Sequence, residues 1–553
     1  MTAVSDLRGS DLSVRLRLYS RQFRAWALKR GRPVLPLYEA ERSTWWVVLR
    51  RLLLLATVCF ITFFYGLLVS VLPPFLLVPA AAPPAILTLV VIWALPDAPR
   101  APVRMLARFF MIFSVIMLLW PNYLSFTFGG LPWISLRRLI GSVAVLLLLV
   151  CISTSKKFRA DSAALLRASP WMTRLMLTFI AVEVISTFTS SAPGETINRF
   201  VDMQIMWTAM FFISAWYFGT AEKNSNRWVN AMLWSAAILM VIGAVEFRVQ
   251  HVLWADHIPS FLKIQDEAVQ QMLRPNFRDR YRVVTTFSSP LSYGEFLALM
   301  APLMLHKLTN SKTVLGLSLW VLADVILLVS CFLSGARLSM VGFIVAHVVY
   351  LLLWSIRRWR TQPGGLIGPA LTMTYPALMI GLSILILSVD GLRLRVLGGG
   401  AAQYSNDARK EQFNLAVPAI SHRPIFGYGP GEGAEAIGWR TLEGKISLDS
   451  GFLTIAADYG LVGFVCFYGA ILIAIVQLAR SGIFARGKDY PLPLALSSML
   501  VALLTARSVL SQQDNNPLVF MMLGLSLALL YRTSQATRTL LVDGTKTRGE
   551  RNG

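Results

Sequence analysis

Arg337 interrupts an otherwise apolar stretch, where an ionisable side chain is costly and marks a candidate functional site, and Arg282 belongs to a cluster of arginines in a polar segment. Arg337 lies in SGARLSM, at the turn between two apolar runs, and Arg282 begins RVVTTFSSPLSYGEFLAL. A planar guanidinium pairs with two phosphate oxygens at once, so the pattern predicts an anion site with diphosphate as its natural ligand. For Arg337, a side chain that only reaches the membrane interface is the alternative.

A polar island from Asn406 to Gly463 separates two other apolar runs. It contains GYGPG at Gly427 to Gly431, DSGFL beginning at Asp449, and DYGLVG. Charge, an aromatic ring and glycines that allow sharp turns are thus concentrated at one membrane surface. Asp449 also stands just before an expected helix, where aspartate is favoured as an amino-terminal cap.

The composition places these residues in a membrane protein. Hydrophobic residues make up 55% and charged residues 15% of the 553 residues, and the mean hydropathy is +0.59, which excludes a water-soluble globule. We predict an all-α, polytopic protein with about fourteen transmembrane helices. The expected spans are approximately 52–72, 77–96, 107–121, 138–154, 172–191, 200–219, 228–247, 290–307, 313–334, 337–356, 367–389, 450–478, 491–509 and 515–531.

The distribution of basic residues predicts the topology. Residues 1–44 form a basic amphipathic segment that we expect in the cytoplasm, ahead of one transmembrane domain at 45–531 and a cytoplasmic tail at 532–553. This orientation places two large loops, 248–289 and 390–449, on the outer face. Arg282, Arg337 and Asp449 then share that side.

Both outer loops are rich in arginine and lysine. Arg280 belongs to the cluster in the first loop and Arg409 to the second. These clusters either bind an anionic ligand or form a solvated surface balanced by nearby carboxylates. The net charge of +23 does not indicate nucleic acid, because the basic residues flank hydrophobic spans.

Cysteine chemistry is not expected. Cys59, Cys151, Cys331 and Cys466 fall inside apolar runs without metal-ligand spacing, so we predict that they are small buried residues.

The sequence resembles the O-antigen ligase and Wzy-type polysaccharide polymerase superfamily, which includes exopolysaccharide polymerases. The resemblance is strongest in the second half of the chain and rests on RVVTTFSSPLSYGEFLAL, SGARLSM, HRPIFGYGPG, DSGFL and DYGLVG. PWISLRRLI, nearer the amino terminus, is similar to a family element that opens an outer-face span. The resemblance implies a GT-C-like glycosyltransferase fold with a large outer-face loop of short helices.

It further implies transfer of a glycan from an undecaprenyl-diphosphate carrier, at the periplasmic face of the bacterial inner membrane, without metal or other cofactor. We expect Arg282 and Arg337 to neutralise the departing diphosphate. Ligases of this superfamily carry a histidine where this chain has Asp449, so Asp449 is our candidate general base, with helix capping as the alternative. The expected substrate-binding residues are Arg409, Arg280, Tyr428, Gly429, Ser450 and Phe452.

Three functions remain open. The acidic Asp449 favours a polymerase that joins lipid-linked repeat units, and an O-antigen ligase that acts on lipid A core is the first alternative. A lipid-linked oligosaccharide flippase is the second alternative. A transporter should carry several ionisable residues at mid-membrane depth, whereas Asp324 is the main acidic residue deep inside a span here, and this disfavours transport. Expected partners are the lipid-linked oligosaccharide, membrane lipid and other polysaccharide assembly proteins, and no nucleic acid.

Overall fold

The computed structural model describes residues 44–71, 77–95, 101–126, 134–264, 281–362, 364–391, 393, 403–441, 444, 446–484 and 491–549. The chain divides into two units, Met1–Pro73 and Pro74–Gly553. The basic amino-terminal segment expected at 1–44 lies outside the described residues, apart from its last residue.

The first unit contains helix α2 (Thr44–Val71), which matches the first expected span. Most of its described side chains are exposed, as expected for an apolar helix in contact with lipid. Cys59 is among these exposed residues, so the prediction that all four cysteines are buried is wrong for Cys59 and correct for Cys151, Cys331 and Cys466.

In the second unit, a helix or a pair of joined helices covers each remaining expected span. Among the described residues, eight helices are long and apolar enough to cross a membrane. The protein is therefore an all-α, polytopic membrane protein. Its helices are α3 (Leu77–Trp93), α4 (Val103–Leu119), α5 (Leu136–Thr154), α6 (Lys156–Leu166), α7 (Pro170–Phe188), α8 (Pro193–Met203), α9 (Ala209–Thr220), α10 (Glu222–Val249), α12 (Pro290–Thr309), α13 (Val314–Leu333), α14 (Arg337–Thr361), α15 (Ile367–Ser388), α17 (Gln403–His422), α18 (Gly433–Ile437), α19 (Gly451–Phe484), α20 (Pro491–Arg507) and α21 (Asn516–Gly549).

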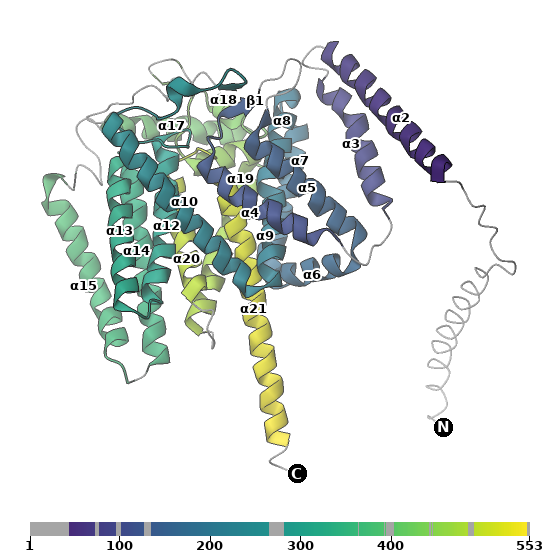
Figure 1. The fold of residues 1–553 in the computed structure, drawn as a ribbon. Coiled ribbons are helices and arrows are strands. Elements are labelled where there is room, and N and C mark those ends of the chain that lie inside the picture. Colours follow the sequence, from purple (N-terminus) through teal and green to yellow (C-terminus); the bar gives the residue numbers. More distant parts are fainter. Residues whose placement is uncertain are drawn as a thin grey trace, which may run out of the picture. The chain divides into compact units, whose positions relative to one another are not determined.

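Helix packing decides which polar residues are enclosed by protein. Helix α21 packs along α9, α19 packs against α7 and α20, and α14 packs against α12 and α20 (Figure 1). Helix α12 is buried on nearly all sides, whereas α15 exposes most of its surface. A polar side chain on α12 therefore faces other protein groups and needs partners among them.

Two spans depart from a regular α-helix. The expected span at 200–219 consists of the end of α8, the π-turn η2 (Gln204–Thr208) and α9. Helix α19 bends at Gly460, where φ is +69°. The Ile425 carbonyl lies so close to Gly460 that a Cβ there would collide with it. A glycine is thus required for both the backbone angle and the contact.

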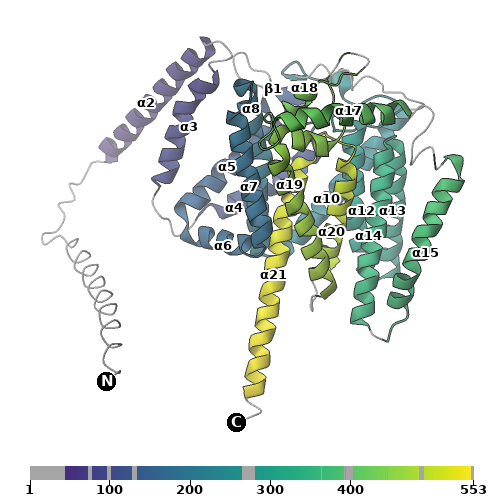
Figure 2. The ribbon, with the colours of Figure 1, turned by 180° about the vertical axis from the view of Figure 1, so that it is seen from behind.

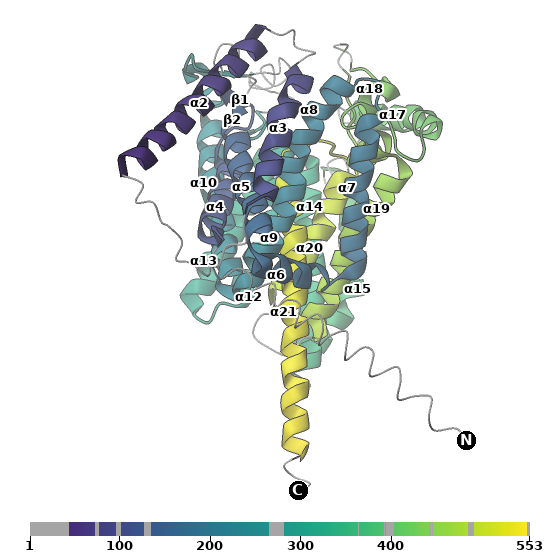
Figure 3. The same cartoon turned by 90° about the vertical axis from the view of Figure 1, so that its right-hand side faces the viewer.

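One end of the second unit carries short helices and strands that lie across the helix bundle, and we call it the capped end. Helices α17 and α18, from the loop expected at 390–449, lie across it (Figure 2). The strands β1 (Leu124–Phe126), β2 (Ile134–Ser135) and β3 (Leu262–Ile264) lie at the same end (Figure 3). They form an antiparallel sheet in the order β2-β1-β3, with Ser125 opposite Ser135.

Candidate functional site

Asp449 lies just before α19 at the capped end, and α17 faces it. Arg409 Nε is 3.9 Å from Asp449 Oδ2, and both side chains are partly exposed. The Asp449 N–H donates a hydrogen bond of 2.9 Å to Gln412 Oε1, and Gln412 is buried. Arg409 and Gln412 are three residues apart and share one face of α17. Helix α17 therefore contacts both the carboxylate and the backbone of Asp449.

Arg282 and Arg337 flank one glycine turn. The Arg282 side chain lies against Gly335, such that a Cβ added at Gly335 would be 2.9 Å from Arg282 Cγ. Gly335 has a φ of +63°, a conformation that other residues rarely adopt. Arg337 follows two residues later, as the first residue of α14. The turn therefore brings two guanidinium-bearing segments together at the capped end.

A buried glutamate holds the segment that carries Arg282. The Glu246 carboxylate accepts hydrogen bonds from the Val284 and Thr285 N–H groups, both at 2.8 Å, and from the Tyr281 hydroxyl at 3.0 Å. Thr285 has a φ of +56°, which is strained for a β-branched residue. Burial and the nearby Glu246 raise the pKa of Tyr281, so its hydroxyl remains a donor.

The end of α20 lies between these two groups of residues. Leu338, next to Arg337, packs with Ala506 and Leu510 in one apolar cluster. Gly451, two residues after Asp449, lies so close to the Leu510 carbonyl that a Cβ would be 2.6 Å from its oxygen. The Arg337 and Asp449 segments therefore rest on the same stretch, 506–510.

Arg507, in that stretch, forms an ion pair with Glu295 of α12. Arg507 Nε lies 3.0 Å from Glu295 Oε1, and both side chains are buried. Asn515 donates a hydrogen bond of 2.8 Å to the other Glu295 oxygen, and Arg507 donates one of 2.7 Å to Asn516 Oδ1. These contacts fix the connection between α20 and α21 to the core.

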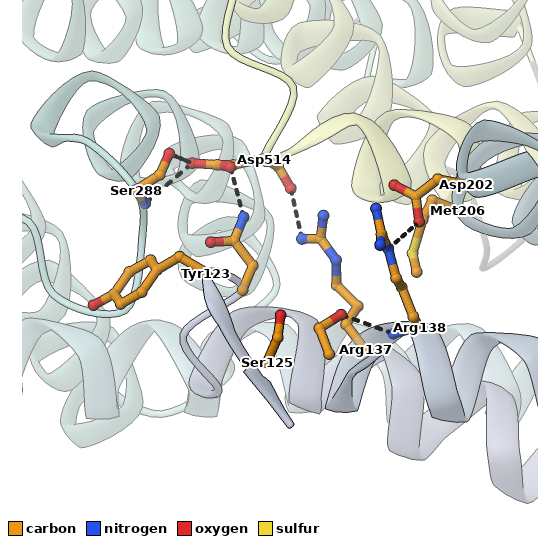
Figure 4. A pocket seen from close by; sticks show the side chains of 10 residues that line it. Tyr123, Ser125, Arg137, Arg138, Asp202, Met206, Ser288 and Asp514 are labelled. Carbon is orange, nitrogen blue, oxygen red and sulfur yellow. Dashed lines mark hydrogen bonds and ion pairs between the residues drawn. The ribbon is translucent and has the colours of Figure 1, made fainter. Parts of the chain in front are cut away.

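A cavity of about 260 Å³ opens beside this connection. Arg137 and Arg138, from the first turn of α5, project into it side by side (Figure 4). Arg138 Nε pairs with Asp202 Oδ1 at 2.8 Å, while Arg137 donates a hydrogen bond of 3.3 Å to the Asp514 carbonyl. Further lining residues are Asn122, Tyr123, Ser125, Ser135, Met206 and Ser288.

Tyr428 and Gly429 are engaged in packing the glycine turn. The Tyr428 hydroxyl donates to the Ala419 carbonyl at 2.9 Å, and its ring lies under the Arg423 guanidinium at 5.1 Å. Gly429 has a φ of +111° and leaves no space for a Cβ beside Ser190. These contacts attach the turn to its own loop and to the segment between α7 and α8.

The carboxylate of Asp458 anchors the same turn to α19. Its two oxygens accept hydrogen bonds from the Gly431 N–H at 3.0 Å and the Gly433 N–H at 2.9 Å. Arg199 of α8 adds an ion pair of 2.7 Å with Glu432. The aspartate of DYGLVG therefore fixes the fold of the GYGPG segment.

The other expected substrate-binding residues are divided between α19 and a segment outside the described residues. The Ser450 carbonyl accepts the first helical hydrogen bond of α19, from Thr454 at 3.0 Å. Phe452 packs edge-on against Tyr468, with ring centroids 4.7 Å apart. Arg280 lies outside the described residues.

Asp324, the acidic residue inside a span, pairs with His347 of α14. The His347 Nε2 atom is 2.9 Å from Asp324 Oδ2, and both side chains are about one-fifth exposed. The pair joins α13 to α14 within the span region, away from the residues that surround Asp449.

Several polar residues at the capped end were not expected from sequence. Arg137 and Arg138 belong to PWISLRRLI, which pointed to the family without a role for either arginine. Glu295 interrupts an apolar span, and this was a usable signal because such residues are functional or paired. Asp514 and Gln412 gave no comparable signal, since isolated polar residues in polar loops are common.

The capped end combines arginines, carboxylates and a polar cavity at one surface of a polytopic membrane protein. Among the residues that the structure describes, no group of three or more His, Cys, Asp or Glu side chains could hold a metal ion. Guanidinium groups are suited to phosphate and carboxylates to hydroxyl groups. The arrangement can thus bind a phosphate-bearing ligand and a hydroxyl-bearing one.

Comparison with known proteins agrees with this description. Residues 322–468 match the model of the O-antigen ligase family. This part of the chain is therefore similar to O-antigen ligases, which is consistent with the O-antigen ligase and Wzy-type superfamily. The matched residues include Arg337, Arg409 and Asp449, whereas Arg282 and the Arg137 cavity lie outside them. No curated protein matches the chain.

Proposed function

We propose that the protein is a polysaccharide polymerase that transfers glycan from an undecaprenyl-diphosphate-linked donor to a lipid-linked repeat unit. The reaction takes place at the periplasmic face of the bacterial inner membrane, with both chain termini in the cytoplasm. The capped end is then the periplasmic end, and loops 248–289 and 390–449 belong to it.

The observation that carries this proposal is the contact of Arg282 with Gly335. It brings two segments, distant in sequence, to one turn and gives that turn two guanidinium groups. The start of α19, with Asp449, rests on the same 506–510 stretch as the residue after Arg337. A phosphate-binding pair and a carboxylate are therefore supported by one structural element.

The chemistry follows from these positions. Arg282 and Arg337 hold the donor diphosphate and stabilise the negative charge that develops when it leaves. Asp449 accepts the proton of the acceptor hydroxyl as its oxygen attacks the anomeric carbon. The bond between the anomeric carbon and the phosphate oxygen breaks, and the lipid diphosphate departs. A lipid diphosphate is already a good leaving group, so this proposal includes no metal.

The ligase remains the second candidate because the matching family model is that of O-antigen ligases. Asp449 favours the polymerase, since it stands where such ligases carry histidine. The flippase is disfavoured by the Asp324–His347 pair, because the acidic residue inside a span is bound to a neighbouring helix.

Purified protein in nanodiscs, supplied with a radiolabelled lipid-linked repeat unit, tests the proposal. We expect a ladder of longer glycans without added metal, and a loss of at least about 100-fold in rate for Arg337→Gln and Asp449→Asn. The matched control is Arg358→Gln, which changes the same residue type about 30 Å further along α14. A ladder of unchanged rate in both site variants would refute the assigned roles.

A further inference from the structure

The cavity beside Arg137 is lined by polar groups from four distant parts of the chain. Residues of strand β1 and of the start of α5 line one side of the cavity. The rest of its lining includes Asp202, Ser288 and Asp514 (Figure 4). Its volume of about 260 Å³ far exceeds the roughly 10–15 Å³ that one water needs. The cavity therefore has space for a polar group of a ligand.

The charged side chains that line the cavity differ in how many hydrogen-bond and ion-pair partners they have. Asp202 is paired with Arg138. The Asp514 carboxylate accepts hydrogen bonds from the Asn122 amide at 2.6 Å and from the Ser288 N–H at 3.2 Å, as well as from the Ser288 hydroxyl. Both carboxylates thus form their hydrogen bonds with groups other than Arg137, although both still attract its guanidinium across the cavity.

The guanidinium group of Arg137 points into the cavity (Figure 4). It donates to the Asp514 carbonyl, and among the described residues it forms no ion pair with a carboxylate. Its remaining guanidinium N–H groups are available to an oxyanion. Arg137 also lies in the first turn of α5, whose amino terminus favours negative charge. An unpaired guanidinium, a helix amino terminus and a cavity point to the same kind of ligand.

We propose that this cavity, whose lining includes neither Arg282 nor Arg337, is a second phosphate-binding site that holds the diphosphate of the acceptor substrate. The inference rests on the proposed function, because a polymerase joins two lipid-linked units and both carry a diphosphate. The donor diphosphate is released in the reaction, whereas the acceptor diphosphate stays bonded to its sugar. Two anion sites are therefore needed, and the Arg137 cavity supplies the second.

Two sites also separate the polymerase from a ligase. A ligase of the proposed alternative kind has one polyprenyl-diphosphate substrate and needs one such site. A second site for the same chemical group is required only when both substrates are carried by the same lipid.

Native mass spectrometry of the full chain, with geranylgeranyl diphosphate as the probe, tests the second site. We expect two bound probe molecules on the wild type, one on Arg137→Gln, one on Arg282→Gln/Arg337→Gln, and two on the control Arg358→Gln. Arg137→Lys keeps the charge without the planar fork, so we expect weakened but detectable second binding. One probe molecule on the wild type, or two on folded Arg137→Gln, would overturn the proposal.

The kinetic experiment assigns the site to the acceptor. With a donor oligomer whose terminal acceptor hydroxyl is blocked and a separate acceptor unit, we expect Arg137→Gln to raise the KM for the acceptor unit at least about 10-fold, without change in the KM for the donor. An equal rise in both would overturn the acceptor role. Binding of the probe in nanodiscs that contain phosphatidylglycerol tests whether an ordinary anionic lipid occupies the cavity. If phosphatidylglycerol displaces the second probe molecule, the proposal is overturned. If the wild type binds two probe molecules but makes no glycan, the proposed function fails while the second anion site stands.

Discussion

Arg507 and Glu295 form a buried ion pair at the capped end, with Nε and Oε1 3.0 Å apart and side-chain exposures of 7% and 0%. The pair joins the end of α20 to α12. The connection that follows Arg507 reaches Asp514 beside the Arg137 cavity, and Leu510 within it contacts Gly451. One ion pair thus positions the element between both proposed substrate sites.

We predict that Glu295→Gln lowers the free energy of unfolding by about 3 kcal/mol, because it leaves the buried Arg507 cation without its counter-charge. Thermal unfolding of the purified protein in one detergent measures the change. The rate of polymerisation should fall as well, since the 506–510 stretch supports the segments of Arg337 and Asp449.

The double variant Glu295→Leu/Arg507→Met provides the control for this prediction. It removes both charges together, so we expect it to be more stable than the single variant Glu295→Gln. If the double variant is the less stable of the two, the ion pair itself stabilises the protein, and the loss in Glu295→Gln is not explained by an unpaired Arg507 charge alone.

We predict that Gly335→Ala lowers the polymerisation rate of the folded protein as well as its stability. A Cβ at Gly335 meets the Arg282 side chain, and the positive φ adds about 1–2 kcal/mol of strain. Displacement of Arg282 should reduce the polymerisation rate at least about 10-fold in the fraction that remains folded. The measurement is the rate per folded molecule, with folded protein counted by gel filtration.

Gly381→Ala is the matched control for that experiment. Gly381 lies within α15, and a Cβ there would meet nothing within 4 Å. Alanine is favoured over glycine in a helix by about 1 kcal/mol, so this variant should be at least as stable as the wild type and equally active. Equal activity of Gly335→Ala and Gly381→Ala would contradict the proposed role of the Arg282 contact.

The expected helices could be located because a helix that crosses a bilayer must be predominantly apolar along its length. The sequence could not indicate how the polar island folds. GYGPG was expected to provide a sharp turn, and its glycines at 427, 429 and 431 do have positive φ. That Asp458, nearly thirty residues later, binds this turn is a long-range contact without periodicity or a local motif.

The residues of the candidate site likewise include some that the sequence indicates and some that only the structure identifies. Arg337 and Asp449 could be found because each stands at the edge of an apolar run. The neighbours that give them a setting, such as Gln412, come from other parts of the chain and are brought close only by packing. Arg137 shows a further limit, because an arginine at the start of a span is also what membrane topology alone would produce.

We predict that Gln412→Leu lowers kcat by about 10-fold with little change in KM. Leucine removes the acceptor of the Asp449 N–H hydrogen bond, which leaves a donor unsatisfied and lets the carboxylate shift. Gln412→Glu keeps an acceptor oxygen, so we expect it to retain most of the activity. A merely structural role would instead lower both variants in proportion to their stability.

We predict that His347→Leu destabilises the protein by about 2 kcal/mol, because Asp324 then loses its partner inside a span. The double variant Asp324→Leu/His347→Leu removes both polar groups and should recover most of the lost stability. Thermal unfolding of the wild type, the single variant and the double variant in the same detergent measures the coupling between the two residues.

The same double variant separates an enzyme from a flippase. An intramembrane Asp–His pair that moved protons or substrate would be needed for transport, whereas a pair that only joins α13 to α14 is replaceable by packed leucines. We therefore expect the folded double variant to make a glycan ladder at the wild-type rate. A ladder lost from a stable double variant would give the pair a functional role, and repeat units retained on the cytoplasmic side in cells that carry it would favour the flippase.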